Sequence, residues 1–236
     1  MFDMVGLTIL SRHAGACEAA RRFGESARTA GEDVSEKPGG RHEQILAVAA
    51  RLFAHKGVAA TTVREIADEV GILSGSLYHH FDSKEAMVDE ILAPYLNALR
   101  EASALVLSSP DNPGARLRDL VIASLRAVEA HPHATEIYQS DANYLGQFER
   151  FGYLTDAASD VRRAWLEVIS DGVSQGAFRA DLDPGILYRL MRDAIWLSVR
   201  WFRPTSRYPI ARFAEDCTSL FLDGIAVPAA AGLGER

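Results

Sequence analysis

Residues 74 to 84 carry small and hydroxyl-bearing side chains where the surface of a short helix would usually be charged. They follow a first short helical pattern and a tight turn, which is the layout of a helix-turn-helix. In that motif the second helix lies in the major groove of DNA. The spacing therefore predicts a DNA-reading head, although the same geometry also occurs in proteins that never touch DNA.

A second pattern lies within the segment LYRLMRDAIWLSVRWFRP. Arg192, Trp196 and Arg200 follow one another at intervals of four, so on a helix they share one face over roughly 12 Å. Arginine offers forked donors to phosphate or carboxylate, and tryptophan offers a broad apolar wall. The pattern predicts a site for a ligand that is anionic and planar or apolar. An alternative is that the arginines pair with acids such as Asp141 while Trp196 belongs to the core.

The first helix of the head begins with a capping box. Thr62 is followed three residues later by Glu65, so the hydroxyl can accept from a backbone N–H while the carboxylate bonds back to the N-cap. Gly71 stands where a left-handed residue would end the helix. Apolar residues with the helical period predict one buried stripe, formed by Val63, Ile66, Ala67 and Val70.

The second helix of the head is predicted to have Ser74 as its N-cap and to run to Phe81. Leu77 and Phe81 lie four apart, so both would pack on the first helix. Asp82 and Glu85 have the spacing of another start signal, which predicts a longer helix. The apolar side of that longer helix is Met87, Val88, Ile91 and Leu92.

Helical periodicity covers most of the remaining chain, and no alternating strand pattern of useful length is present. Proline and glycine separate the helical patterns. The prediction is an all-α fold of about nine helices, with a three-helix helix-turn-helix DNA-binding head and a larger helical ligand-binding and dimerisation domain. The first helix is expected at 42–55, with Ile45, Ala49, Leu52 and Phe53 inward and Gly57 as C-cap, and later ones at 116–130, 133–149, 153–176, 184–202 and 209–226.

Charge and composition limit the function classes to which the chain can belong. The formal net charge is −7, and residues 41 to 88 carry five basic and six acidic side chains. One near-neutral head would hold phosphates weakly, so we expect a homodimer on a palindromic double-stranded DNA operator. No apolar run approaches the roughly 18 residues of a membrane span, and the start lacks the features of a secretory signal. Cys17 and Cys217 lie far apart, as expected for a reduced cytoplasmic protein.

The string TTVREIADEVGILSGSLYHHFDSKEAM resembles the DNA-binding domain of TetR-type transcriptional regulators almost position for position. The resemblance extends over roughly residues 42 to 226. It implies that Thr62, at the N-cap of the first helix of the pair, faces a DNA phosphate. It also implies that Arg64 lies at the DNA-facing start of the same helix. The other contacts that it implies are base-edge or sugar contacts by Ser74, Gly75 and Ser76, and phosphate contacts by Tyr78, His80 and Lys84, with His79 as a further candidate.

Three segments are similar to the KstR class of actinobacterial cholesterol-catabolism repressors, most of all in the branch that controls degradation of the steroid C and D rings: SGSLYHHFDSKEAMVDE, AVEAHPHATEIYQSDANYL and YRLMRDAIWLSVRWFRP. This resemblance implies an effector that is the coenzyme A thioester of a bicyclic steroid remnant, and no further cofactor. It also implies derepression, in which effector binding shifts the helix that links pocket to head and spoils the major-groove spacing of the two recognition helices. The implied ligand residues are Arg192, Trp196 and Arg200, with the aromatic Tyr138, Tyr144 and Trp165.

We expect four segments along the chain. Residues 1–40 form an N-terminal extension that is interpreted as a mobile arm, and residues 41–88 form the DNA-binding domain. Residues 89–227 form the ligand-binding and dimerisation domain, and residues 228–236 a flexible tail. In relatives of this family the last two helices supply the dimer surface, for which the candidate apolar contacts are Leu190, Leu197, Phe213, Leu220 and Phe221.

Other function classes fit the residues less well. An enzyme would need a Gly-rich phosphate loop, a nucleophile elbow or a metal-spaced cluster, and the sequence contains none of these. His131 and His133 flank a proline, which is typical of a helix break and not of a metal pair. The alternatives left open are a TetR-type regulator that responds to another acyl-CoA or small apolar anion, and a DNA-binding protein without small-molecule control.

Overall fold

The computed structural model describes residues 40–226. Over this range the chain forms nine α-helices and two short 3-10 helices, and its only β-structure is an isolated bridge between Phe178 and Ala226. The all-α prediction and the number of helices are confirmed. The α-helices are α2 (Arg41–Lys56), α3 (Val63–Val70), α4 (Ser74–Leu77), α5 (Lys84–Ser108), α6 (Pro113–Ala130), α7 (Pro132–Leu145), α8 (Gly152–Ser174), α9 (Pro184–Trp196) and α10 (Ile210–Ile225), and the 3-10 helices are η1 (Glu149–Phe151) and η2 (Leu197–Arg200).

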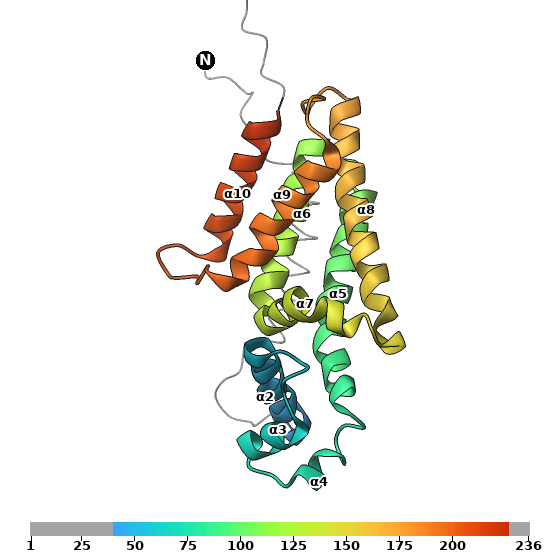
Figure 1. Cartoon of the computed structure of the whole chain (residues 1–236). Helices are drawn as coiled ribbons and strands as arrows, with labels where there is room; N and C mark the ends of the chain where they lie inside the picture. Colours follow the sequence, from blue (N-terminus) through green and yellow to red (C-terminus); the bar gives the residue numbers. More distant parts are fainter. Residues whose placement is uncertain (1–39, 227–236) are drawn as a thin grey trace, which may run out of the picture.

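Helices α2, α3 and α4 form a small head at one end of an elongated molecule (Figure 1). The predicted capping box of α3 is present, because the Thr62 hydroxyl accepts from the Glu65 N–H at 3.2 Å and Glu65 Oε2 accepts from the Thr62 N–H at 2.8 Å. Gly71 has a φ of 75° in the left-handed region and ends α3 as predicted. The buried apolar side chains of the head are Ile45, Ala49, Leu52, Phe53, Val58, Ile66, Ala67, Val70, Leu77 and Phe81.

The body contains the long helices α5, α6 and α8, with α9 packed on α6 and α8, and α10 packed on α6. Helix α5 begins in the head and continues far into the body, and it contains Pro94. Because proline lacks an N–H, it removes one hydrogen bond and favours a bend at this point. Helix α7 lies across the end of the body and packs on α2 (Figure 1). The head is thus joined to the body by one continuous helix and by the packing of α2 on α7.

Two of the predicted N-caps are wrong by one residue. Leu73, and not Ser74, is the N-cap of α4, and no side chain caps this helix. Ser83, and not Asp82, is the N-cap of α5, where its hydroxyl accepts from the Ala86 N–H at 3.1 Å. At α4 no side chain accepts from the first turn, and at α5 the neighbouring side chains of Asp82 and Ser83 could each accept, so only the backbone path decides which residue is the N-cap.

The helix predicted over residues 184–202 ends earlier. Helix α9 stops at Trp196 and continues as η2. The Ser198 hydroxyl donates to the Ile195 carbonyl, and the Trp201 N–H bonds to the Ser198 carbonyl with the shorter 3-10 spacing. A serine that bonds to the backbone within its own turn competes with the α-helical pattern, so the helix tightens and ends.

Among residues 40–226, no helix has both the length and the apolar character that crossing a bilayer requires. The predicted N-terminal arm lies outside the described residues except for Gly40, which is the N-cap of α2. The predicted C-terminal tail also lies outside them.

Candidate DNA interface and effector site

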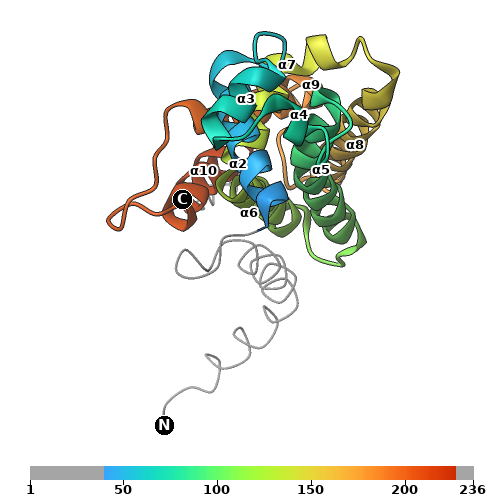
Figure 2. The same ribbon diagram turned by 90° about the horizontal axis from the view of Figure 1, so that it is seen from below.

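The predicted DNA-facing surface lies at the head end of the molecule, and Figure 2 looks onto that end with α3 and α4 in front. Leu77 and Phe81 are buried as predicted, which turns the rest of α4 outward. The candidate contact residues are therefore accessible to a duplex, although their individual contacts stay predictions. Thr62, Arg64, Gly75, Tyr78, His79 and His80 are exposed, and Ser74 and Ser76 are half-buried.

Ion pairs within the head neutralise much of its positive charge. Arg51 Nη2 lies 2.5 Å from Glu69 Oε1, and Lys56 Nζ lies 2.8 Å from Glu65 Oε1. The hydrogen bond from Lys56, together with those from Thr62, lowers the pKa of Glu65 from 4.5 to about 2. A single head therefore offers little free charge to phosphates, which agrees with the expectation that two heads act together.

Lys84 has a structural role that its position in the sequence did not reveal. Its Nζ donates to the carbonyl oxygen of Val58 at 2.7 Å and to that of Thr61 at 3.1 Å, both in the turn between α2 and α3. An ammonium group has three N–H donors, so one remains for the phosphate contact that the resemblance implies. Lys84 thus positions the turn from the first residue of α5.

Asp141 on α7 holds the same turn. Its Oδ1 accepts from the Val58 N–H at 3.3 Å in a buried hydrogen bond. Burial raises the pKa of Asp141, while the Val58 bond and the charge of Lys84 act in the opposite direction. Both polar groups of Val58 are therefore bound by charged side chains, one from α5 and one from α7. We call Asp141, Val58 and Lys84 the joint clamp.

The joint clamp excludes Asp141 as the acid that pairs with the arginines near Trp196, whereas Trp196 itself is buried in the core, as the alternative interpretation of the sequence predicted. Asp141 was a possible acid for the arginines near Trp196, but it bonds to Val58 instead. Arg192 instead pairs with the adjacent Asp193, whose Oδ1 lies 2.7 Å from Arg192 Nη2. Asp141 therefore belongs to the contact between head and body.

Three of the six predicted ligand residues come together in the body. Trp165 on α8 and Trp196 on α9 have ring centroids 6.0 Å apart. Tyr138 on α7 lies 6.4 Å from Tyr95 on α5, whose hydroxyl is close to the Trp196 side chain. Tyr188 on α9 lies 6.2 Å from Trp165. We call these five residues the aromatic cluster.

Arg192 lies at the edge of the aromatic cluster. Burial raises the pKa of Tyr138 and of Tyr188, and the charge of Arg192 acts against this shift at both tyrosines. Its ion pair with Asp193 is exposed, and such pairs contribute little to stability. Arg192 can therefore exchange Asp193 for an anionic group of a ligand at low cost.

Arg200 is separated from this arrangement because α9 ends before it. It lies in η2 and lines a cleft of about 540 Å³ between α2 of the head and α7 of the body. The predicted single helix face from Arg192 to Arg200 is therefore wrong beyond Trp196. The other ionisable residues that line the cleft are Arg51, His55, His133, Glu136 and Arg203.

Tyr144 belongs to a second aromatic group. Its ring centroid lies 5.2 Å from that of Phe148, which in turn lies 6.1 Å from Phe151 in η1. Tyr144 lies in the last turn of α7 and the two phenylalanines follow it, so the group is on the far side of Asp141 in sequence from Tyr138. Among the described residues, the ring contact of Tyr144 is thus with Phe148 and not with a ring of the aromatic cluster.

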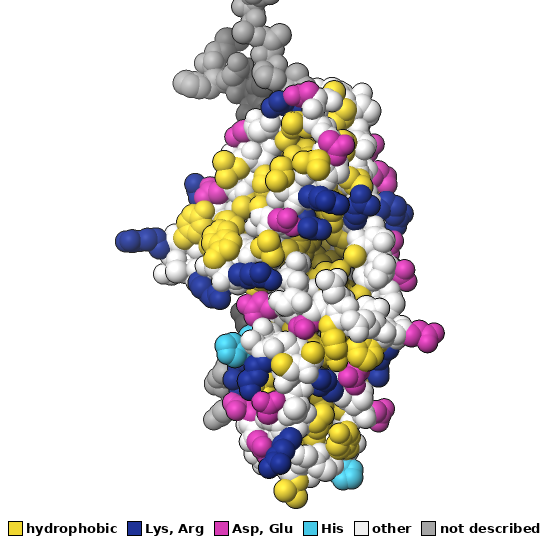
Figure 3. All heavy atoms as spheres, viewed as in Figure 1, with side chains coloured by type: hydrophobic (Ala, Val, Ile, Leu, Met, Phe, Trp, Pro, Cys, Tyr) yellow, Lys and Arg dark blue, Asp and Glu magenta, His cyan; other side chains and the backbone are white. Residues whose placement is uncertain are grey.

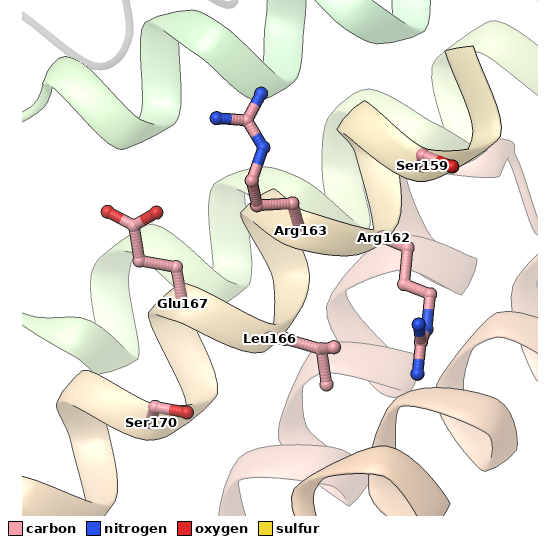
Figure 4. Close-up of a pocket in the computed structure, with 6 residues that line it drawn as sticks. All are labelled: Ser159, Arg162, Arg163, Leu166, Glu167 and Ser170. Atoms are coloured by element: carbon pink, nitrogen blue, oxygen red, sulfur yellow. The ribbon is translucent and has the colours of Figure 1, made fainter. Parts of the chain in front are cut away.

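Arg162, Tyr95 and Tyr188 are candidate site residues that the sequence reasoning missed. In Figure 4, Arg162 and Leu166 point from α8 toward α9, whereas Arg163 points toward the green helices on the other side. The charge of Arg162 acts on Tyr188 of the aromatic cluster. Because Arg162 precedes Trp165 by three residues, helical spacing alone could have indicated that they share a face.

The surface of the body is hollowed on one side. Figure 3 shows, on the side of the body where α8 and α9 lie, a hollow with apolar side chains inside and Lys or Arg side chains above it. An apolar interior with basic groups at the rim is the arrangement that an amphipathic anion needs. The surface therefore agrees with the ligand chemistry predicted from Arg192 and Trp196.

The predicted dimer contacts divide into three groups by their exposure. Leu190 on α9 and Leu220 on α10 are exposed by 65% and 73%, so they can contact a partner. Leu197 and Phe221 are half-buried. Phe213 is buried and stacks on Phe202 with centroids 4.3 Å apart, which places it in the core of the body.

Models of known families match both parts of the chain. A model described as bacterial regulatory proteins of the tetR family matches residues 45–91, which include most of the head and the start of α5. A model described as a tetracyclin repressor-like C-terminal domain matches residues 110–225, which include α6 to α10.

Individual relatives match over most of their length. The HTH-type transcriptional repressor KstR2 of Rhodococcus jostii (strain RHA1) is 44% identical over 197 residues, which are 84% of this chain and 96% of that protein. KstR2 of Mycobacterium tuberculosis (strain H37Rv) is 43% identical over 185 residues, which are 78% of this chain and 92% of that protein. A solved structure of the ketosteroid transcriptional regulator KstR2 of Mycobacterium tuberculosis has a TM-score of 0.75 at 42% identity and covers 83% of this chain and 100% of its own.

Proposed function

The chain belongs to the tetR family of bacterial regulatory proteins and to its KstR class of transcriptional repressors, and on this basis we propose that a coenzyme A thioester of a steroid C/D-ring fragment releases it from its operator. The genes under its control would be those of cholesterol catabolism. The observation that carries the proposal is the buried aromatic cluster with Arg192 at its edge.

The two parts of such a thioester match the two kinds of group at the site. The ring faces of Trp165 and Trp196 can pack against fused apolar rings, which removes apolar surface from water. Arg192 and Arg162 can donate forked hydrogen bonds to the phosphates of coenzyme A. Neither the free acid nor free coenzyme A would contact both the aromatic rings and the two arginines as the thioester does. We therefore expect only the thioester to release the protein from DNA.

The joint clamp offers a route from the effector to the head. Tyr138 and Asp141 lie three residues apart on α7, so a shift of α7 at the aromatic cluster also moves the acceptor of the Val58 N–H. Pro94 weakens α5 next to Tyr95, which allows the head and the body to change their angle. In a dimer, such a change alters the distance between the two α4 helices, which must match successive major grooves.

The test measures release from DNA. Full-length protein bound to a labelled duplex from the region upstream of its own coding sequence is titrated with the steroid-fragment thioester. We expect a loss of fluorescence anisotropy at saturating thioester, and none with free coenzyme A or with the free acid at equal concentration.

A titration with an unrelated long-chain acyl-CoA distinguishes this proposal from a second candidate function. The second candidate is a repressor of the same class that responds to another acyl-CoA or a small apolar anion, and it is favoured by Arg162 and Arg192, which can bind phosphates whatever the acyl group. Equal release by both thioesters would contradict the steroid assignment and support this candidate.

A further inference from the structure

Leu73 is exposed at an unusual place in the head. Its side chain is exposed by 79%, which is the largest value among the large apolar side chains of residues 40–226. It lies in the turn of the helix-turn-helix, between the half-buried Ile72 and the first residue of α4. A single exposed leucine is common on protein surfaces, so exposure alone assigns it no role.

Leucine is an unfavourable residue for helix stability at this backbone position. Leu73 is the N-cap of α4, and its side chain cannot accept a hydrogen bond from the first turn. Four other helices of the described chain have a polar N-cap whose side chain does accept such a bond. These N-caps are Thr62 for α3, Ser83 for α5, Asn112 for α6 and Asp183 for α9.

The neighbours of Leu73 leave room for it to reach a duplex. Ser74, Gly75 and Ser76 follow it with small side chains, and Leu77 is buried and anchors the helix. The N-terminal residues of a recognition helix are those that contact base edges in the major groove. Leu73 is therefore a large exposed apolar group at the end of α4 that such a docking would direct toward the groove.

The major-groove edges of DNA carry one apolar group, which is the C5-methyl of thymine. We propose that Leu73 contacts this methyl group in each half of the operator and so contributes to the choice of base there. The proposal concerns DNA reading alone and does not depend on which effector releases the protein.

The experiment begins with a duplex that the full-length protein selects from a random library. Each symmetric pair of thymines in the selected duplex is then replaced by uracil, which removes the methyl group and keeps the base pair. Since burying a methyl-sized group is worth roughly a fourfold change in affinity, we expect one such pair to weaken binding about fifteenfold over the two half-sites.

The variant Leu73→Ser shows whether Leu73 is the residue that senses the methyl group. Serine restores a side chain that can cap α4, so the variant should fold at least as stably as the wild type, as thermal unfolding will show. We expect it to bind the thymine and uracil duplexes with the same affinity, because the two changes remove the same contact. Leu105→Ser is the matched control, since Leu105 is a 58% exposed leucine on α5 outside the head, and it should keep the full sensitivity to uracil.

Two results would overturn the proposal. In the first, no uracil pair weakens wild-type binding. In the second, Leu73→Ser remains as sensitive to the critical uracil pair as the wild type, which would assign the methyl contact to another residue.

Discussion

The head and the body are built to recognise their ligands in opposite ways. In the head, the candidate DNA contacts come from one stretch, residues 62–84, and most of them are exposed. In the body, the aromatic cluster is assembled from α5, α7, α8 and α9, and most of its rings are buried. Side chains that read a duplex must project into its grooves, whereas a site for an apolar ligand must exclude water. Local spacing can therefore reveal the first kind of surface more fully than the second.

The pKa shifts of three carboxylates follow from whether each is exposed or buried. Glu65 lies at the surface of the head, and hydrogen bonds from Lys56 and Thr62 lower its pKa to about 2. In the body, burial raises the pKa of Asp119 and of Asp141. Hydrogen bonding to the charged form dominates at Glu65, and desolvation dominates at Asp119 and Asp141. Exposed carboxylates of the body that bond to arginine, such as Asp160, behave like Glu65.

The largest expected effect comes from a change in the body that acts on the head. Leu220→Glu places a charge on the exposed apolar surface of α10, so we expect the dimer to dissociate. Loss of the second head should weaken operator binding roughly 10²- to 10⁴-fold, although no DNA contact is altered. Sedimentation velocity and fluorescence anisotropy measure the two effects, and Leu105→Glu on α5 is the control. A dimeric Leu220→Glu variant would show that this surface is not the dimer interface.

The second largest effect is expected on effector binding in the body, without a change in DNA binding by the head. Arg192→Met removes a cation beside the aromatic cluster, and we expect effector affinity to fall about 10- to 150-fold, as for the loss of a hydrogen bond to a charged group. Operator binding should be unchanged, because Arg192 lies on α9. Isothermal titration with the thioester tests this, with the exposed Arg189→Met on the same helix as control. Trp196→Leu is a less clean test, since Trp196 is buried and its loss also destabilises the core.

The third effect concerns the contact between the two regions. Asp141→Ala leaves the buried Val58 N–H without an acceptor, so we expect the free energy of unfolding to fall by about 1–3 kcal/mol. Asp141→Asn keeps an acceptor and removes a buried charge, so its stability at pH 7 should equal or exceed that of the wild type. Urea denaturation of both variants measures this. If Asp141→Asn is as unstable as Asp141→Ala, the hydrogen bond to Val58 is not what stabilises the joint clamp.

The smallest effect is confined to the head. Thr62→Ala removes the capping box of α3 and should cost about 1 kcal/mol of stability, whereas Thr62→Ser should cost little.

The pH dependence of the same capping box can be checked with Glu65→Gln. Because the folded-state pKa of Glu65 is lowered from 4.5 to about 2, its contribution is present above pH 4.5 and is lost as the pH falls toward 2. The stability difference between wild type and Glu65→Gln should therefore shrink between pH 5 and pH 2. A difference that does not change over this range would contradict the assigned pKa.

The sequence predicted the head in detail because its structure is local. The capping box at Thr62, the left-handed Gly71 and the buried pair Leu77 and Phe81 each depend on residues within a few positions of one another. The same reasoning was wrong by one residue at Ser74, since the backbone of the turn makes Leu73 the N-cap although its side chain cannot accept a hydrogen bond.

The effector site could be predicted only in part. Helical spacing correctly associated Arg192 with Trp196, but it extended the helix to Arg200, which the Ser198 turn places in the cleft beside the head. The contacts of Trp165, Tyr95 and Tyr188 join helices far apart in the chain, and no local pattern specifies them.

By itself, therefore, the sequence determined the fold class, the helix-turn-helix and the family, because periodicity, capping and glycine conformation act over short distances. Only the tertiary structure decided which aromatic rings meet, that Asp141 and Lys84 hold Val58, and that Leu73 remains exposed at the start of α4. These features depend on how separate helices pack, and packing is set by the shape and burial of the whole core.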